Sequence, residues 1–269
     1  MKNYDAYLID LDGTMYRGDE PVPFASAFVE KLAKKRIPYL FLTNNSSKTP
    51  QQVSSKLEDM GIRSQPEQVF TTSMAAAKYI KQQNAEARCY VIGEDGLFDA
   101  LEKEGHQIAE NDCDFVVVGM DRKITYEKLS KACLEVRNGA EFLSTNGDVA
   151  IPTERGLEPG NGALTSVISV STGKKPVFIG KPESVIMDQA LEELGAIKES
   201  TLMVGDNYDT DILAGIHAGI DTLMVFTGVT PYDHYATFPE KPTYHVHYLN
   251  EWLAHIINAL SKGQFFNVS

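Results

Sequence analysis

Short apolar runs alternate with segments of helical spacing along most of this chain, and this alternation restricts the possible folds more than any other feature. The runs predicted to be strands are Ala6–Ile9, Tyr39–Leu42, Cys89–Ile92, Phe115–Val118, Glu141–Ser144, Val177–Ile179, Leu202–Val204 and Thr222–Phe226. Strands that alternate with helices form a parallel sheet that is covered by helices on both faces. The sequence therefore predicts an α/β protein with a doubly wound parallel sheet.

Start and stop signals mark one of the intervening helices clearly. Thr49 occupies the N-cap position, Pro50 the first helical position, and Gln52 the position three after the cap, while Gly61 follows the last turn.

The middle of the chain is interpreted as a second domain. Its predicted strands end in VIGEDG, VVVGMD and LSTNGD, whereas the outer strands end in LIDLDGT, FLTNNSS, FIGKPES and MVGDNYD. We expect a core domain made of residues 1–79 plus 178–269, and an inserted α/β domain at residues 80–177 with a sheet of its own.

Composition narrows the class of protein. The 269 residues can bury a sizeable core, and a net charge of −12 argues against nucleic acid and membranes as partners. Cys89, Cys113 and Cys133 are scattered and odd in number, so we interpret them as buried thiols rather than disulfides or a zinc site. Without a secretory signal or an apolar run of membrane-spanning length, a cytoplasmic protein is expected.

Two aspartates follow the first predicted strand. Because Asp10 and Asp12 are two residues apart on an extended segment, both carboxylates face the same crevice, and Gly13 allows a sharp turn after them. Carboxylates this close repel each other, which raises one pKa unless a cation intervenes. A metal could keep Asp10 ionised as a nucleophile, and a raised pKa could make Asp12 a proton donor.

Further carboxylates follow another predicted strand, Leu202–Val204. Asp206 comes two residues after it and Asp211 five residues later. Ligands of α/β sheets lie outside the carboxyl ends of the strands, and a few carboxylates with waters and a phosphate usually hold Mg²⁺. The sequence therefore predicts a magnesium site, although Asp211 is about as well explained as a helix cap.

Groups suited to a phosphate follow two more predicted strands. Thr43 and Asn44 follow Tyr39–Leu42, where a hydroxyl and backbone N–H groups suit phosphoryl oxygens, although a plain turn is the alternative. Lys181 follows Val177–Ile179 and can bind phosphate as a point charge, although most lysines are simply solvated.

Four sequences resemble, in chain order, the motifs of the haloacid dehalogenase (HAD) superfamily: LIDLDGTMYRG, FLTNNSSKTP, IGKP and GDNYDTDILAG. Their residues are most similar to the motifs of its NagD-like phosphatases. The resemblance spans nearly the whole chain. It implies a Rossmann-like core, a cap domain of the C2 type in the inserted segment, Mg²⁺ as the cofactor, and a possible homodimer. In the cap, Thr145–Asp148 (TNGD) resembles a frequent TNPD with Gly147 in place of proline, and Pro159–Leu164 (PGNGAL) is also similar to the family.

The resemblance implies roles for the acidic residues. Asp10 matches the nucleophile, and Asp12 the general acid and base whose backbone carbonyl binds the metal. Asp206 matches the metal-binding acid and Asp211 a supporting carboxylate.

It also implies roles in phosphate binding. Thr43 and Asn44 match the phosphate-binding loop, Lys181 the lysine that neutralises the phosphoryl group, and Asn207 a residue that faces the phosphate.

The function expected from these features is that of a phosphoric monoester hydrolase. It would act on a small phosphorylated metabolite of the acid sugar phosphate type, and on p-nitrophenyl phosphate in vitro. A carboxylate at Asp12 favours phosphoryl transfer over dehalogenation, because a halide leaves without a proton. Three alternatives stay open: a nucleoside monophosphate phosphatase, a phosphotransferase, and a catalytically weak protein that binds or senses a phosphorylated ligand.

Overall fold

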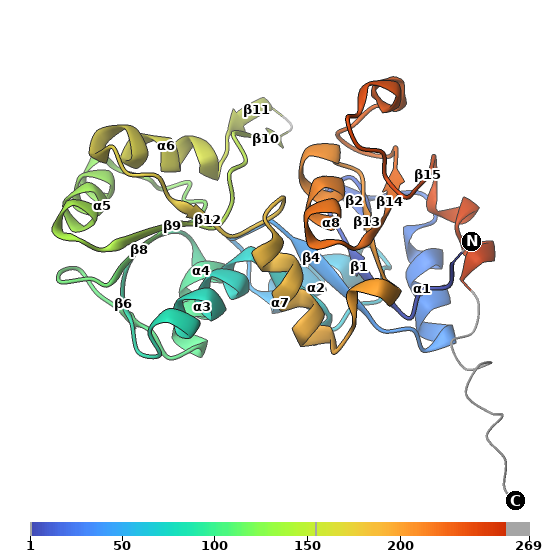
Figure 1. The fold of residues 1–269 in the computed structure, drawn as a ribbon, viewed down its shortest axis with the longest axis horizontal. Coiled ribbons are helices and arrows are strands. Elements are labelled where there is room, and N and C mark those ends of the chain that lie inside the picture. The colour runs from blue at the N-terminus through green and yellow to red at the C-terminus, as the bar shows by residue number, and fades with distance from the viewer. Residues whose placement is uncertain (1, 154, 257–269) are drawn as a thin grey trace, which may run out of the picture. The chain divides into compact units, whose positions relative to one another are not determined.

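The computed structural model describes residues 2–153 and 155–256, which form two compact units (Figure 1). The first unit combines the stretch up to Leu42 with Ser55–Gln68 and the stretch from Met187 onward. The second unit combines Thr43–Ser54 with Val69–Ile186. The domain limits at residues 80 and 177 stay a prediction.

The helices are α1 (Ala25–Lys35), α2 (Pro50–Asp59), α3 (Thr72–Gln83), α4 (Asp95–Lys103), α5 (Tyr126–Asn138), α6 (Asn161–Thr172), α7 (Ser184–Leu194) and α8 (Leu213–Ala218). Short 3₁₀ turns lie at Pro66–Gln68, Lys198–Ser200, Tyr232–Thr237, Leu249–Glu251 and Leu253–His255, and a π-helical turn at Tyr208–Ile212. In the part of the chain that the structure describes, no helix combines the length and the apolar character needed to cross a membrane.

The strands are β1 (Ala6–Ile9), β2 (Tyr16–Arg17), β3 (Glu20–Pro21), β4 (Tyr39–Thr43), β5 (Val69–Thr71), β6 (Arg88–Ile92), β7 (Gln107–Ile108), β8 (Phe115–Val118), β9 (Glu141–Ser144), β10 (Ala150–Thr153), β11 (Gly156–Pro159), β12 (Val177–Phe178), β13 (Thr201–Gly205), β14 (Asp221–Val225) and β15 (Tyr244–Val246). Every run predicted to be a strand is one, with ends that differ by at most one residue.

A parallel sheet with the order β15-β14-β13-β1-β4 forms the centre of the first unit. All four residues of β1 are buried, as expected for a strand that is covered on both faces. The chain moves from β1 through α1 to β4 in one direction and from β13 through α8 to β14 in the other (Figure 1). Right-handed crossovers therefore place α1 and α8 on opposite faces, which makes the sheet doubly wound.

The second unit has its own parallel sheet, ordered β12-β9-β8-β6-β7, and an antiparallel hairpin of β10 and β11. Side chains of β6, β8 and β9 form a core with α5 and α6, whose buried members are Tyr90, Ile92, Val116, Val118, Ala132, Cys133, Val136, Ala140, Phe142 and Ile168. The three cysteines are free thiols in this unit; Cys89 and Cys133 are buried as predicted, and Cys113 is half-buried.

The helix signals around α2 act as predicted. The Thr49 backbone N–H donates to Gln52 Oε1 at 2.9 Å, and the Gln52 backbone N–H donates to Thr49 Oγ1 at 3.3 Å. This reciprocal pair is a capping box, which satisfies two donors at the helix start. Gly61 has a φ of 72°, a left-handed conformation that ends the helix without strain on a side chain.

Candidate active site

Asp10 and Asp206 come directly after β1 and β13, two neighbouring strands whose paired residues include Ile9 and Val204. The chain leaves these strands in opposite directions across the sheet, so their carboxyl ends border the point where the strand order reverses. Open α/β sheets bind their ligands at that point.

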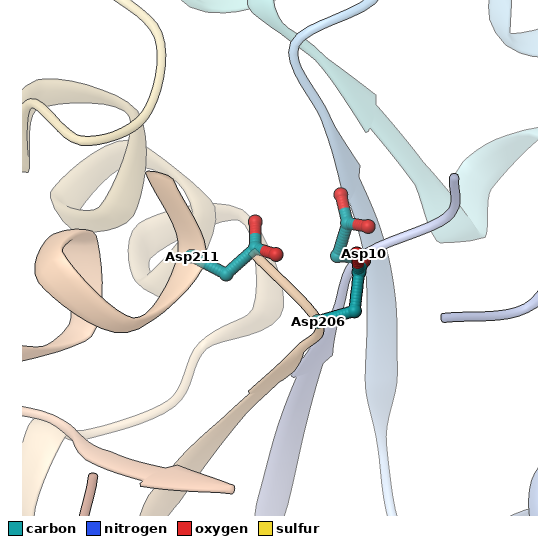
Figure 2. A group of neighbouring side chains, drawn as sticks. All are labelled: Asp10, Asp206 and Asp211. Carbon is teal, nitrogen blue, oxygen red and sulfur yellow. The ribbon is translucent and has the colours of Figure 1, made fainter. Parts of the chain in front are cut away.

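Three carboxylates meet there, as Figure 2 shows: Asp10 from the end of β1, Asp206 from the end of β13, and Asp211 from the turn before α8. One oxygen of each lies within 4.8 Å of the others, and the side chains are 8%, 0% and 1% exposed. Buried like charges at this separation repel, and carboxylate oxygens are the ligands that hard divalent cations prefer. The cluster therefore fits a divalent metal ion.

The hydroxyl of Thr14 lies between two of these carboxylates. Thr14 Oγ1 donates to Asp206 Oδ1 at 3.0 Å and lies 3.4 Å from Asp10 Oδ2, and the side chain is fully buried. One hydroxyl proton can serve only one acceptor at a time, so the shorter contact with Asp206 dominates. Thr14 follows Asp10 by four residues in the same motif, but its role was not predicted.

The π-helical turn Tyr208–Ile212 directs Asp211 into the cluster. Asn207 is the residue that caps this turn, because its side-chain oxygen accepts from the Asp209 backbone N–H at 3.1 Å. Asp211 lies inside the turn, and its Oδ2 accepts from the Asn207 backbone N–H at 3.0 Å. Asp211 thus lies beside the other two carboxylates, and its role as a support for the metal stays a prediction. Single π turns are frequent at functional sites.

Asp12 lies outside the three-carboxylate group, and its side chain reaches solvent. Protein atoms around it still remove part of its hydration and raise the pKa of its carboxyl, while the charge of Lys56 lowers it. Lys56 Nζ also lies 4.4 Å from the centre of the Tyr16 ring. Burial, followed by the charges of Asp12 and Asp10, raises the pKa of Tyr16, so this phenol stays neutral.

Asn44 and Lys181, both predicted to bind phosphate, meet in the second unit. Asn44 Nδ2 donates to the Lys181 backbone carbonyl at 2.9 Å, and the Lys181 side chain is only 2% exposed. Thr43, the last residue of β4, is buried, and its hydroxyl accepts from the Asn45 backbone N–H at 3.1 Å. The described contacts thus form two groups, one around Asp10 and one around Asn44.

The TNGD and PGNGAL sequences hold the Asn44 loop. Asn146 Nδ2 donates to the Asn44 backbone carbonyl at 2.8 Å, and Asn44 Nδ2 lies 3.3 Å from Asp148 Oδ2. Asn161 Nδ2 in turn donates to the Asn146 backbone carbonyl at 2.9 Å. A Cβ atom on Gly180 would lie 2.6 Å from Asn44 Oδ1, so this approach needs glycine. The sequence does not predict these contacts, although both segments resemble the family's motifs.

Comparison with known proteins finds two family models and several relatives that match this chain. The model of the haloacid dehalogenase-like hydrolases matches residues 7–107, and a HAD-hydrolase-like model matches residues 178–252. The chain is 59% identical to the 5'-nucleotidase YutF of Bacillus subtilis over 95% of its own length and 100% of that protein. It is 53% identical to an acid sugar phosphatase of Staphylococcus epidermidis over 95% of its length and 99% of that protein.

A solved structure shows the same fold. NagD from Escherichia coli K-12 is 34% identical, with a TM-score of 0.88 over 93% of this chain and 98% of that one. The residues at the strand ends, the three-carboxylate group and these similarities are all consistent with one family of phosphatases. The chain therefore belongs to the haloacid dehalogenase-like hydrolases, among the NagD-like phosphatases of that family.

Proposed function

We propose that this phosphatase is a magnesium-dependent phosphomonoesterase that hydrolyses a small phosphorylated metabolite through an aspartyl-phosphate on Asp10. The observation that carries the proposal is the group of three buried carboxylates at the carboxyl ends of β1 and β13. A phosphoryl group is anionic, so buried carboxylates are useful in binding it only when a cation offsets their charge.

Asp10 performs the first step as an in-line nucleophile on phosphorus, and Asp12 protonates the departing oxygen of the ester. Asp12 then removes a proton from a water molecule that cleaves the aspartyl-phosphate and restores Asp10. The assignment to Asp12 rests on its place two residues after Asp10 and on the family resemblance.

Asp10, Asp206 and the backbone carbonyl of Asp12 would hold the Mg²⁺ ion, with Asp211 in support. When bound, the ion supplies positive charge that stabilises the developing charge on the phosphoryl oxygens. Thr14 and the π-helical turn orient the carboxylates before any ligand arrives. Such prior orientation lowers the reorganisation that the reaction requires.

The roles proposed for Thr43, Asn44, Lys181 and Asn207 are to bind phosphoryl oxygens, and they rest on the sequence resemblance. Asn44 and Lys181 are supported by their mutual contact in the second unit. The Asn207 side chain caps the π-helical turn, so its backbone and its place beside Asp206 support the assignment more than its amide group does.

An acid sugar phosphate is the substrate class we favour, because the similar proteins of several staphylococci carry the name acid sugar phosphatase. A nucleoside monophosphate is the second candidate, favoured by the 59% identity to a protein named 5'-nucleotidase. We also propose a cytoplasmic location and a homodimer as an assembly to be tested.

The test is phosphate release from p-nitrophenyl phosphate by the full-length protein, with and without Mg²⁺, for wild type and Asp10→Asn. We expect EDTA to abolish turnover, Mg²⁺ to restore it, and the variant to stay inactive at every Mg²⁺ concentration. Turnover by Asp10→Asn at the wild-type rate would refute the nucleophile. Wild-type kcat/KM for hexose phosphates against nucleoside 5'-monophosphates then decides between the two substrate classes. Tight binding of one of them without turnover would instead identify a ligand-binding protein.

A further inference from the structure

A four-residue segment after β14, Thr227–Thr230, contacts one carboxylate of the cluster directly. The Val229 backbone N–H donates to Asp206 Oδ2 at 2.6 Å. A hydrogen bond to a carboxylate is about twice as strong as one between neutral groups. Asp206 is fully buried, so water does not compete for this acceptor.

Two threonines tie the ends of this segment to the loops around it. Thr227 Oγ1 donates to the Gly13 backbone carbonyl at 2.7 Å, and Arg17 Nε donates to the Thr227 backbone carbonyl. At the other end, Thr230 Oγ1 accepts from the Tyr208 backbone N–H at 2.9 Å. The segment thus links the loop that follows Asp10 to the π-helical turn that follows Asp206.

Two glycines enclose the Asp206 carboxylate. A Cβ atom on Gly228 would lie 1.9 Å from Asp206 Oδ2, and one on Gly13 would lie 2.4 Å from the same oxygen. Neither position can accept a side chain without displacing the carboxylate. With Thr14 on Oδ1 and Val229 on Oδ2, both oxygens also have a fixed donor. The two glycines and the two hydrogen-bond donors therefore fix the orientation of the Asp206 carboxylate.

We propose that Thr227–Thr230 is a positioning segment, which holds the Asp206 carboxylate ready for a divalent cation and so raises the affinity of the site for Mg²⁺. The inference rests on the proposed function in one respect, that Asp206 is a ligand of the cation. Groups that orient a metal ligand typically change metal affinity about 10- to 100-fold when they are removed. The segment acts through a backbone N–H, so proline is the substitution that removes its contact.

The experiment compares Val229→Pro with Val229→Ala in the full-length protein. The Val229 side chain is 61% exposed, so its loss should matter little, and alanine retains the backbone N–H. The difference between the two variants therefore reports the effect of the N–H donor. Calorimetric titration of the metal-free proteins with Mg²⁺ is the measurement. We expect Val229→Pro to bind Mg²⁺ about 10-fold more weakly or worse, and Val229→Ala to bind it with wild-type affinity.

Thr227→Val provides a second test in case proline disturbs the loop. It removes the hydroxyl contact with Gly13 at nearly constant volume, and Thr227→Ser restores the donor. We expect Thr227→Val to weaken Mg²⁺ binding and Thr227→Ser to recover it, with circular dichroism and thermal melting reporting whether each variant is folded. Wild-type Mg²⁺ affinity in folded Thr227→Val or Val229→Pro overturns the inference. A wild-type protein that binds no Mg²⁺ overturns the proposed function instead.

Discussion

Replacing Asp206 by Asn should stabilise the metal-free protein, because it removes one of three buried charges that repel each other. Two unit charges 4.8 Å apart interact by about 3 kcal/mol at an effective dielectric constant of about 20. Asp206 takes part in two such pairs. Asparagine is isosteric, and it can keep both contacts: its carbonyl can accept from Val229 N–H, while its amide donates to a reoriented Thr14 hydroxyl.

The gain is partly offset, because hydrogen bonds to a neutral amide are weaker than those to a carboxylate, by roughly 1 kcal/mol each. A net stabilisation of up to about 4 kcal/mol remains for the metal-free protein. Each kcal/mol raises the Tm of a protein of this size by about 2–4 °C, so the rise should be several degrees. Saturating Mg²⁺ should reduce this difference in stability between the variant and wild type. A ligand at 100 times its Kd stabilises wild type by about 2.7 kcal/mol, whereas the variant should not gain this stability.

The assay is thermal melting of wild type and Asp206→Asn in EDTA and in a Mg²⁺ series. We expect the variant to melt higher than wild type in EDTA and to respond weakly to Mg²⁺. A variant that melts lower in EDTA, or that keeps the full Mg²⁺ response, would refute the idea that repulsion among these carboxylates is relieved by a bound cation.

Three further outcomes test other parts of the structure. Asn146→Ala removes the donor to the Asn44 backbone carbonyl, so steady-state kinetics should show a KM for p-nitrophenyl phosphate about 10-fold higher, the equivalent of one hydrogen bond; an unchanged KM would separate this contact from phosphate binding. Phe238→Ala removes a buried ring stacked on Tyr208 at 3.9 Å and should lower the free energy of unfolding in urea by about 3–5 kcal/mol; a loss below about 1 kcal/mol would mean that the loop does not depend on this stack. Burial and then the charge of Glu135 raise the pKa of the Cys113 thiol to about 11, so its alkylation by iodoacetamide should be slow at pH 8 and rise about tenfold per pH unit up to that pKa; a rate that levels off near pH 9 would contradict the shift.

The longer strands could be predicted because burial on both faces leaves a continuous apolar run, as in β1 and β8. The shortest strands have no such pattern. Both residues of β3 and both residues of β7 are exposed, so their pairing depends on neighbours that a local sequence window does not contain.

Asp10 and Asp206 could be placed together from the sequence because parallel strands end at the same edge of a sheet. Asp211 could not be decided between cap and cluster, because its direction depends on the π-helical turn. The Asp12 carboxylate lies outside the three-carboxylate group. The expectation that it faces the same crevice as Asp10 therefore stays a prediction. The Val229 contact left no signal at all, since it joins a backbone N–H to an acceptor 23 residues earlier in the chain.

The pairing of β1 with β13 also has a consequence for how the protein is made. Its register joins Ala6 to Thr201 and Ile9 to Val204, so one edge of β1 has no partner until nearly 200 residues have been synthesised. At about 5–20 residues per second, that wait is on the order of 10–40 s. During this time, the unpaired N–H and C=O groups along that edge of β1 can pair with other chains, and its four side chains, all buried in the folded protein, are not yet covered. The strand that delivers Asp10 is therefore open to mispairing along this edge until β13 has been synthesised.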